Sequence, residues 1–109
     1  KHYNGGIIIS AHIGNWEIGP KFFLHHGIKV KSIYRELNNS MVNDITAKAR
    51  NIDLIAKNSQ GNKQIITELK KGNYIIIMVD QKITGGLDIP FFHKNALTSP
   101  SPAKLALKY

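Results

Sequence analysis

The feature that most constrains this chain is the regular return of short apolar segments, with a helix-like segment between each pair. The apolar segments begin near positions 6, 28, 52 and 74. The stretches between them carry apolar residues at helical spacing or polar residues that can cap a helix. This alternation is typical of βαβ units, which build a parallel sheet covered by helices. We therefore predict an α/β fold with a mostly parallel sheet flanked by helices, present here as an incomplete domain.

The expected elements are short and follow one another closely. Strands are predicted over residues 6–10, 28–34, 52–56 and 74–79, and helices over residues 21–26, 40–50, 62–71 and 103–109. The last of these strands is apolar without interruption, so we expect it to be covered on both faces of the sheet. A polar turn is expected over residues 57–61, and a glycine-rich loop is expected after Asp80.

Composition narrows the functional classes. The 109 residues suffice for one small domain. The absence of cysteine excludes disulfides, thiolate zinc sites and a cysteine nucleophile. Fifteen lysine and arginine residues against seven acidic residues give a net charge of +8, which attracts anionic partners, although scattered basic residues equally fit a solvated surface. No apolar run approaches the roughly 18 residues that a membrane-spanning helix needs.

Polar clusters follow three of the predicted strands. They cover residues 12–17, 34–39 and 80–82, after the first, second and fourth strands. In open α/β sheets, ligands bind beyond the carboxyl ends of the strands. The sequence therefore predicts a site where these three clusters meet.

His12 and Glu17 are the first candidates for chemistry at this site. On a continuous helix their spacing would point the two side chains roughly 140° apart. They can meet only if the chain bends, and Gly14 with Asn15 can supply that bend. A carboxylate would then fix the imidazole tautomer, while the other ring nitrogen takes a proton from a hydroxyl group. The alternative, that His12 merely ends a strand and Glu17 begins a helix, stays open on spacing alone.

A metal site is not expected. His12 and Glu17 lack the i, i+4 spacing of zinc-binding pairs on a helix, and His25 and His26 are adjacent and should point apart. We expect His2, His25 and His26 to be surface residues, and no sequence pattern indicates a cofactor.

The stretch from Ser10 to Gly19 resembles the H-x4-D/E motif of glycerolipid acyltransferases. It is most similar to the HxGNWE form found in the lipid A late acyltransferases, the lauroyl and myristoyl transferases of Gram-negative bacteria. Three further blocks resemble that family in the same order: Tyr34-Arg35 with Asn38-Asn39 and Arg50, then Val79-Asp80-Gln81, then Ile89-Pro90-Phe91-Phe92 with Ala96 and Thr98. One such block is a weak signal, whereas four in order are a strong one.

The resemblance implies an enzyme that moves a fatty acyl chain from acyl carrier protein to a hydroxyl of a lipid A precursor. It implies that His12 is the general base and Glu17 its orienting partner. The reaction would take place without a cofactor, at the cytoplasmic face of the bacterial inner membrane.

The resemblance also implies substrate-binding roles for five residues: Arg35, Asp80, Asn15, Asn38 and Arg50. Arg35 would hold a phosphate or polarise the thioester carbonyl, although an ion pair with Glu36 or Asp44 is the alternative. Asp80 equally fits a loop cap, and the other three residues fit turn or helix-end positions. The aromatic pair Phe91 and Phe92 favours a core position over a place in an acyl channel.

The sequence departs from the family pattern in two respects. His93 stands where the family usually has glycine, which puts the local turn in doubt. Family members are usually longer, with an apolar membrane segment at the amino terminus, so residues 1–109 are interpreted as the central catalytic segment, with that anchor and a carboxyl-terminal part absent. Three alternatives stay open: a related phospholipid or glycolipid acyltransferase, a basic module that binds nucleic acid or an acidic protein, and an inactive fragment. No nucleic-acid-binding motif is present, so nucleic acid is not the expected partner.

Overall fold

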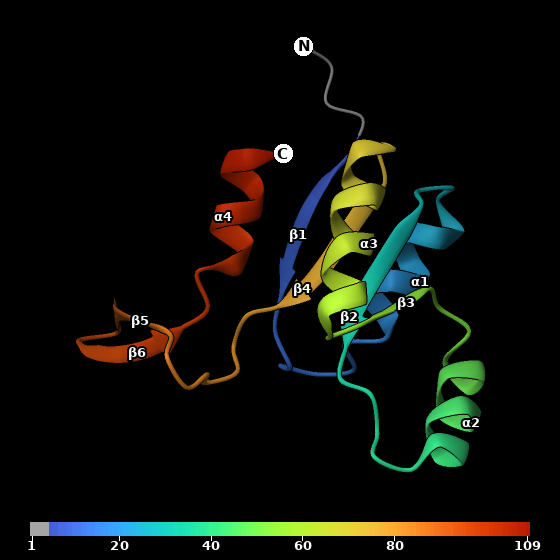
Figure 1. Cartoon of the computed structure of the whole chain (residues 1–109), viewed down its shortest axis with the longest axis horizontal. Helices are drawn as coiled ribbons and strands as arrows, with labels where there is room; N and C mark the ends of the chain where they lie inside the picture. The colour runs from blue at the N-terminus through green and yellow to red at the C-terminus, as the bar shows by residue number, and fades with distance from the viewer. Residues whose placement is uncertain (1–4) are drawn as a thin grey trace.

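The computed structural model describes residues 5–109. Six strands and four helices are found in this part of the chain (Figure 1). In chain order the elements are β1 Gly6–Ser10, α1 Ile18–His25, β2 Val30–Tyr34, α2 Ser40–Arg50, β3 Leu54–Ala56, α3 Ser59–Lys70, β4 Tyr74–Met78, β5 Leu87–Phe91, β6 Lys94–Thr98 and α4 Ser101–Lys108.

Strands β1 to β4 form one parallel sheet in the spatial order β1-β4-β2-β3. The predicted α/β class and parallel sheet are therefore confirmed. The strand order places β4 between β1 and β2, although β4 is the last of these four strands in the sequence (Figure 1). Successive residues of β4, Ile75 and Ile76, are both buried, at 0% and 3% exposure. Successive side chains of a strand point to opposite faces, so β4 is covered on both sides, as its uninterrupted apolar sequence predicts.

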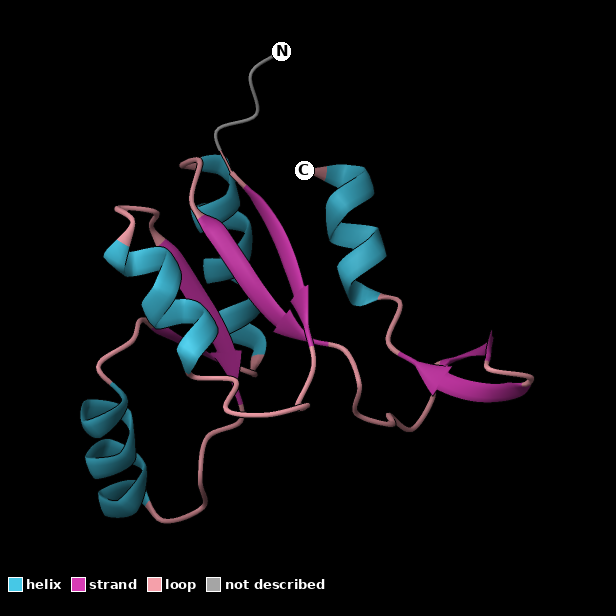
Figure 2. Cartoon of the chain, turned by 180° about the vertical axis from the view of Figure 1, so that it is seen from behind, coloured by secondary structure: helices cyan, strands magenta, loops and turns pink. Residues whose placement is uncertain are grey.

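Three of the four helices cover the two faces of this sheet. Helix α1 covers one face, while α3 and α4 lie on the other, as the two opposite views agree (Figures 1 and 2). Between the sheet and α3 the core contains Ile55, Ile65 and Ile75, and Leu105 of α4 packs against this cluster. Burial of each isoleucine contributes about 1.5–3 kcal/mol, so this cluster is the main source of stability on that face.

Helix α1 begins at Ile18, three positions before the predicted start at residue 21. Pro20 lies in its first turn and is fully buried. A proline is tolerated there because the first backbone amides of a helix have no partner within the helix.

Helix α3 also begins earlier than predicted, at Ser59 rather than at residue 62. The side chain of Asn58 accepts a hydrogen bond from the amide of Gly61 at 2.8 Å and caps the first turn. A side chain at Gly61 would collide with the carbonyl oxygen of Ala56. The predicted polar turn at 57–61 is therefore wrong in its second half, where the glycine lets α3 approach β3.

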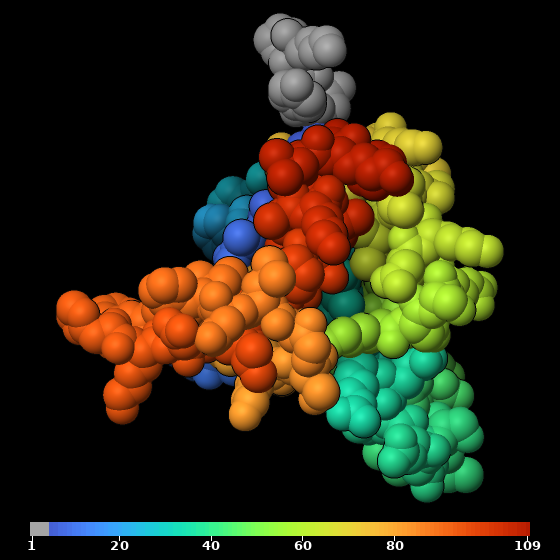
Figure 3. Space-filling view, turned by 60° about the vertical axis from the view of Figure 1, so that its left-hand side comes forward, coloured from blue at the N-terminus to red at the C-terminus, as the bar shows by residue number. Residues whose placement is uncertain are grey.

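The two remaining strands, β5 and β6, form an antiparallel hairpin that the sequence did not predict. It projects from the body of the molecule (Figure 3). At its tip Phe92 and His93 both have positive φ, at 45° and 63°. His93, where the resemblance implies a glycine, thus takes a backbone conformation that favours glycine. Phe91 and Phe92 are 65% and 83% exposed, so the prediction that they belong to the core is wrong.

Helix α2 extends away from the sheet, and none of its residues is buried (Figure 1). Asn39 caps its first turn by accepting the amide hydrogen of Val42 at 3.2 Å. Within residues 5–109, every helix is too short or too polar to cross a bilayer.

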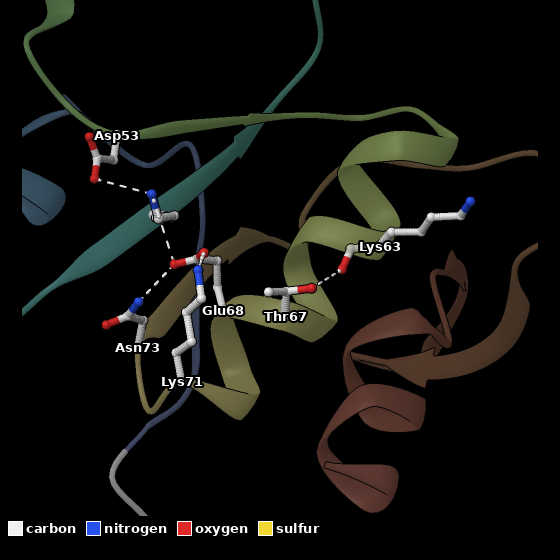
Figure 4. A network of polar contacts seen from close by, with 7 residues as sticks. Asp53, Lys63, Thr67, Glu68, Lys71 and Asn73 are labelled. Atoms are coloured by element: carbon white, nitrogen blue, oxygen red, sulfur yellow. Dashed lines mark hydrogen bonds and ion pairs between the residues drawn. The ribbon is translucent and has the colours of Figure 1, made fainter.

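A buried carboxylate joins the amino ends of β2 and β4. Glu68, near the end of α3, accepts hydrogen bonds from Asn73 at 2.7 Å and from Lys71 at 3.1 Å, and Lys31 lies 3.9 Å away (Figure 4). Burial alone would raise the pKa of Glu68. These hydrogen bonds and the two lysine charges outweigh burial and hold that pKa below its ordinary value.

Candidate active site

The strand order determines the partner of His12. Because β1 and β4 are neighbours in register, Ser10 pairs with Met78, and the backbone amide of Val79 donates to the carbonyl of Ser10 at 3.1 Å. His12 and Asp80 each lie two positions beyond this pair. Two residues that are 68 positions apart in the sequence are thereby brought side by side.

Asp80 holds His12 through both of its carboxylate oxygens. Oδ2 accepts the backbone amide hydrogen of His12 at 2.7 Å, and Oδ1 lies 2.9 Å from Nδ1 of the imidazole. An ionised carboxylate can only accept, so Nδ1 carries the hydrogen and Nε2 is left as the basic nitrogen. The backbone hydrogen bond from His12 is the larger cause, and the side-chain hydrogen bond the smaller cause, that hold the pKa of Asp80 below its ordinary value. Asp80 therefore remains ionised.

The expected contact between His12 and Glu17 is wrong. Gly14 does bend the chain, with φ of 149°, but the bend directs the carboxylate elsewhere. The side-chain oxygen of Asn15 accepts the amide hydrogen of Glu17 at 3.1 Å. The backbone carbonyl of Asn15 accepts the amide hydrogen of Ile18, also at 3.1 Å. These bonds start α1, and Oε1 of Glu17 accepts from Nε of Arg50 at 2.9 Å instead.

A cleft of about 600 Å³ lies at this edge of the sheet. Its basic lining residues are His12, Arg35, Arg50, Lys57 and Lys82. Its lining contains no aspartate or glutamate in the described part of the chain, whereas four isoleucines and one leucine form its apolar wall. His12 and Arg50 are paired with Asp80 and Glu17, but Arg35, Lys57 and Lys82 have no carboxylate partner within residues 5–109. The cleft therefore has a positive potential and favours an anionic ligand that also has an apolar part.

The predicted site residues divide into four groups by their place in the structure. His12, Arg35 and Arg50 line the cleft, while Asp80 and Glu17 hold two of these residues from behind. Asn15 shapes the turn. Asn38 lies in the exposed loop after β2 and is not among the lining residues.

Arg35 does not form the ion pair that was considered as an alternative to a role in the cleft. The alternative of an ion pair with Glu36 or Asp44 finds no support within residues 5–109, since Glu36 instead accepts a hydrogen bond from Asn58 at 3.2 Å. The guanidinium group of Arg35 is therefore available to the cleft.

One basic residue of the cleft, Lys57, lies outside both the three predicted clusters and the predicted site residues, whereas Lys82 belongs to the cluster at residues 80–82. Lys57 directly follows β3. The rule that ligands bind beyond the carboxyl ends of parallel strands would have indicated its position as well. Trp16 also lines the cleft and lies under the guanidinium of Arg50, with Cζ 5.2 Å from the ring centroid.

Of the other histidines within residues 5–109, none lines this cleft. His25 and His26 are exposed, as predicted, and His2 lies outside the described residues. Among residues 5–109 no group of three or more histidine, aspartate or glutamate side chains is placed to hold a metal ion.

One comparison with known proteins identifies a family. Residues 1–109 match the family described as bacterial lipid A biosynthesis acyltransferase, so the match covers the whole chain. No curated protein matches the sequence.

Proposed function

The chain belongs to the bacterial lipid A biosynthesis acyltransferase family, and we propose that it transfers a laurate- or myristate-class acyl chain from acyl carrier protein to a hydroxyl of a lipid A precursor. The family assignment makes the protein an acyltransferase of lipid A biosynthesis. The donor, the acyl chain and the roles of individual residues are part of the proposal. The observation that carries it is the Asp80–His12 pair at the wall of a basic cleft.

In the proposed reaction His12 acts as the general base. Its Nε2 takes the proton of the acceptor hydroxyl as the oxygen attacks the thioester carbonyl carbon. The new C–O bond forms, the C–S bond breaks, and the proton passes from the imidazolium to the departing sulfur. Asp80 fixes the tautomer and stabilises the imidazolium while the proton resides there. This assigns to Asp80 the orienting role that the sequence had suggested for Glu17.

The remaining cleft residues suit the two ends of the substrates. Arg35, Arg50, Lys57 and Lys82 supply donors for the phosphates of a lipid A precursor and for the developing oxyanion. The apolar wall suits the acyl chain. The net charge of +8 favours an acidic carrier protein and the anionic cytoplasmic face of the inner membrane as partners.

The direct test is His12→Ala in the intact protein, assayed by transfer of a labelled acyl chain to lipid A precursor. Loss of a general base is expected to lower the rate roughly 10²- to 10⁴-fold. His25→Ala is the matched control, because His25 is an exposed histidine outside the cleft. Full activity in His12→Ala would end the catalytic assignment.

Acceptor profiling separates the closest alternative. A related enzyme acting on a phospholipid or glycolipid would use the same base and cleft. It would acylate that acceptor at a higher kcat/KM than the lipid A precursor. A module that binds nucleic acid would instead bind random DNA with an affinity that falls with salt and is unchanged in Arg35→Ala.

A further inference from the structure

The carboxylate of Glu17 is engaged with α2 rather than with the imidazole. Its Oε1 atom accepts from Nε of Arg50 at 2.9 Å, and both side chains are half-buried. Arg50 is the last residue of α2, and Glu17 immediately precedes α1. One ion pair therefore joins the turn after β1 to the end of a helix that has no buried residue of its own.

Two contacts determine how the guanidinium group of Arg50 lies. Nε donates to Glu17, and one face of the group stacks on Trp16 in a cation–π contact. Within residues 5–109 neither Nη group of Arg50 has a protein acceptor, and Arg50 lines the same cleft as His12. Because the guanidinium is a rigid planar fork, fixing Nε and one face also fixes the direction in which both Nη groups donate.

We propose that Glu17 is a positioning residue for Arg50, holding its guanidinium at the wall of the cleft so that the Nη groups bind a phosphate of the acceptor. The inference rests on the proposed acyl transfer. It assigns Glu17 to acceptor binding rather than to proton transfer. The imidazole has no vacancy for a second carboxylate, because Asp80 occupies Nδ1 and Nε2 must stay free to take the proton.

A double-mutant cycle on kcat/KM tests the coupling. Glu17→Gln and Arg50→Ala are each expected to lower kcat/KM for the acceptor roughly 10- to 100-fold, mainly through a higher KM. In the double variant the Glu17 change should add less than about twofold, because its effect passes through Arg50. Arg50→Lys keeps the charge but loses Nε and the planar fork, so it should restore little of the affinity.

A second double-mutant cycle combines Glu17→Gln with Asp80→Asn. Asp80→Asn is the matched control, because it changes the other carboxylate of the site. These two changes should multiply, since they act on different groups. The pH profile of kcat/KM should shift in Asp80→Asn and keep its position in Glu17→Gln. If Glu17→Gln shifts that profile, or is non-additive with Asp80→Asn, Glu17 acts through His12 and the inference is overturned. A rise in KM for the acyl donor alone would overturn the assignment to the acceptor.

The two proposals fail in different ways. Retained activity in His12→Ala removes the acyl-transfer mechanism itself. Loss of activity in His12→Ala, together with independent effects of Glu17→Gln and Arg50→Ala, removes only the positioning role. A thermal melt of each variant separates both outcomes from loss of folding.

Discussion

The two ends of the parallel sheet carry carboxylates in opposite situations. At the amino ends of the strands Glu68 is 6% exposed and receives hydrogen bonds from Lys71 and Asn73, with Lys31 nearby. At the carboxyl ends Asp80 and Glu17 are about a third exposed, at 34% and 29%, and each holds one partner that faces a cleft. The first carboxylate is surrounded by its donors, whereas the other two orient groups whose remaining nitrogens are open to a ligand.

This difference indicates that the carboxylate at the amino ends of the strands stabilises the fold, whereas those at the carboxyl ends orient groups that face the cleft. A buried carboxylate with every oxygen engaged has nothing left to offer a substrate, so its loss should cost folding free energy. A half-exposed carboxylate contributes less to folding, so its value lies in fixing an imidazole or a guanidinium. Changes at the two ends should therefore separate activity from stability.

The largest expected effect is at the carboxyl end. Asp80→Asn keeps the shape of the side chain but removes the charge that stabilises the imidazolium of His12. We expect kcat to fall roughly 10²- to 10⁴-fold, while the melting temperature changes little because Asp80 is exposed. Steady-state kinetics beside a thermal melt check this. A large drop in melting temperature with unchanged kcat would reverse the comparison.

An intermediate effect is expected at the amino end. Glu68→Gln removes a buried charge from two hydrogen bonds and should lower the free energy of unfolding by about 1–3 kcal/mol. Its kcat per folded molecule should match that of the unchanged protein. Chemical denaturation measures the first quantity and the acyl-transfer assay the second. Lys63→Gln on the exposed side of α3 is the control, and should change neither.

The same carboxylate predicts how stability depends on pH. The folded-state pKa of Glu68 lies below its ordinary value of 4.5, so the unfolded chain takes up the proton first as pH falls. The stabilisation is fully present above pH 4.5 and is lost as pH falls through the folded-state pKa. Glu68→Gln should remove this part of the acid sensitivity. Identical acid-unfolding curves for the two proteins would contradict the account.

The smallest expected effect lies at the hairpin, away from both ends of the sheet. His93→Gly should raise the free energy of unfolding by about 1 kcal/mol, because glycine adopts its positive φ without strain. Lys94→Gly, in the adjoining strand, should instead destabilise by roughly 0.5–1 kcal/mol. If both glycines act alike, the turn at His93 is not strained. Neither change should affect kcat, so the two variants give a reference for the effects expected at the two ends of the sheet.

Much of the sheet could be predicted because its signals are local. The uninterrupted apolar run ending at Val79 identifies a strand covered on both faces, and Asn39 identifies the start of α2 from its capping side chain. The hairpin could not be predicted in this way. The glycine-rich sequence before it indicates a loop, and its turn at Phe92 and His93 lacks the asparagine and glycine residues that usually mark such turns.

The cleft lies at the predicted edge of the sheet, but the contact of His12 was not predicted. Its position at the carboxyl ends of the strands follows from the alternating pattern alone. The partner of His12 depends on strand order, and nothing local in the sequence says that β4 inserts beside β1. The nearby carboxylate of Glu17 was therefore chosen over Asp80, which is 68 positions away. Proximity in sequence favoured the wrong pair.

The central claim is that Asp80, and not Glu17, fixes the tautomer of His12. The most direct measurement is the ¹⁵N and ¹H NMR spectrum of the imidazole of His12 in the labelled protein and in two variants. We predict a protonated Nδ1 with a slowly exchanging hydrogen, kept in Glu17→Gln and lost in Asp80→Asn. A protonated Nε2, or a signal that disappears in Glu17→Gln and survives in Asp80→Asn, would contradict the account.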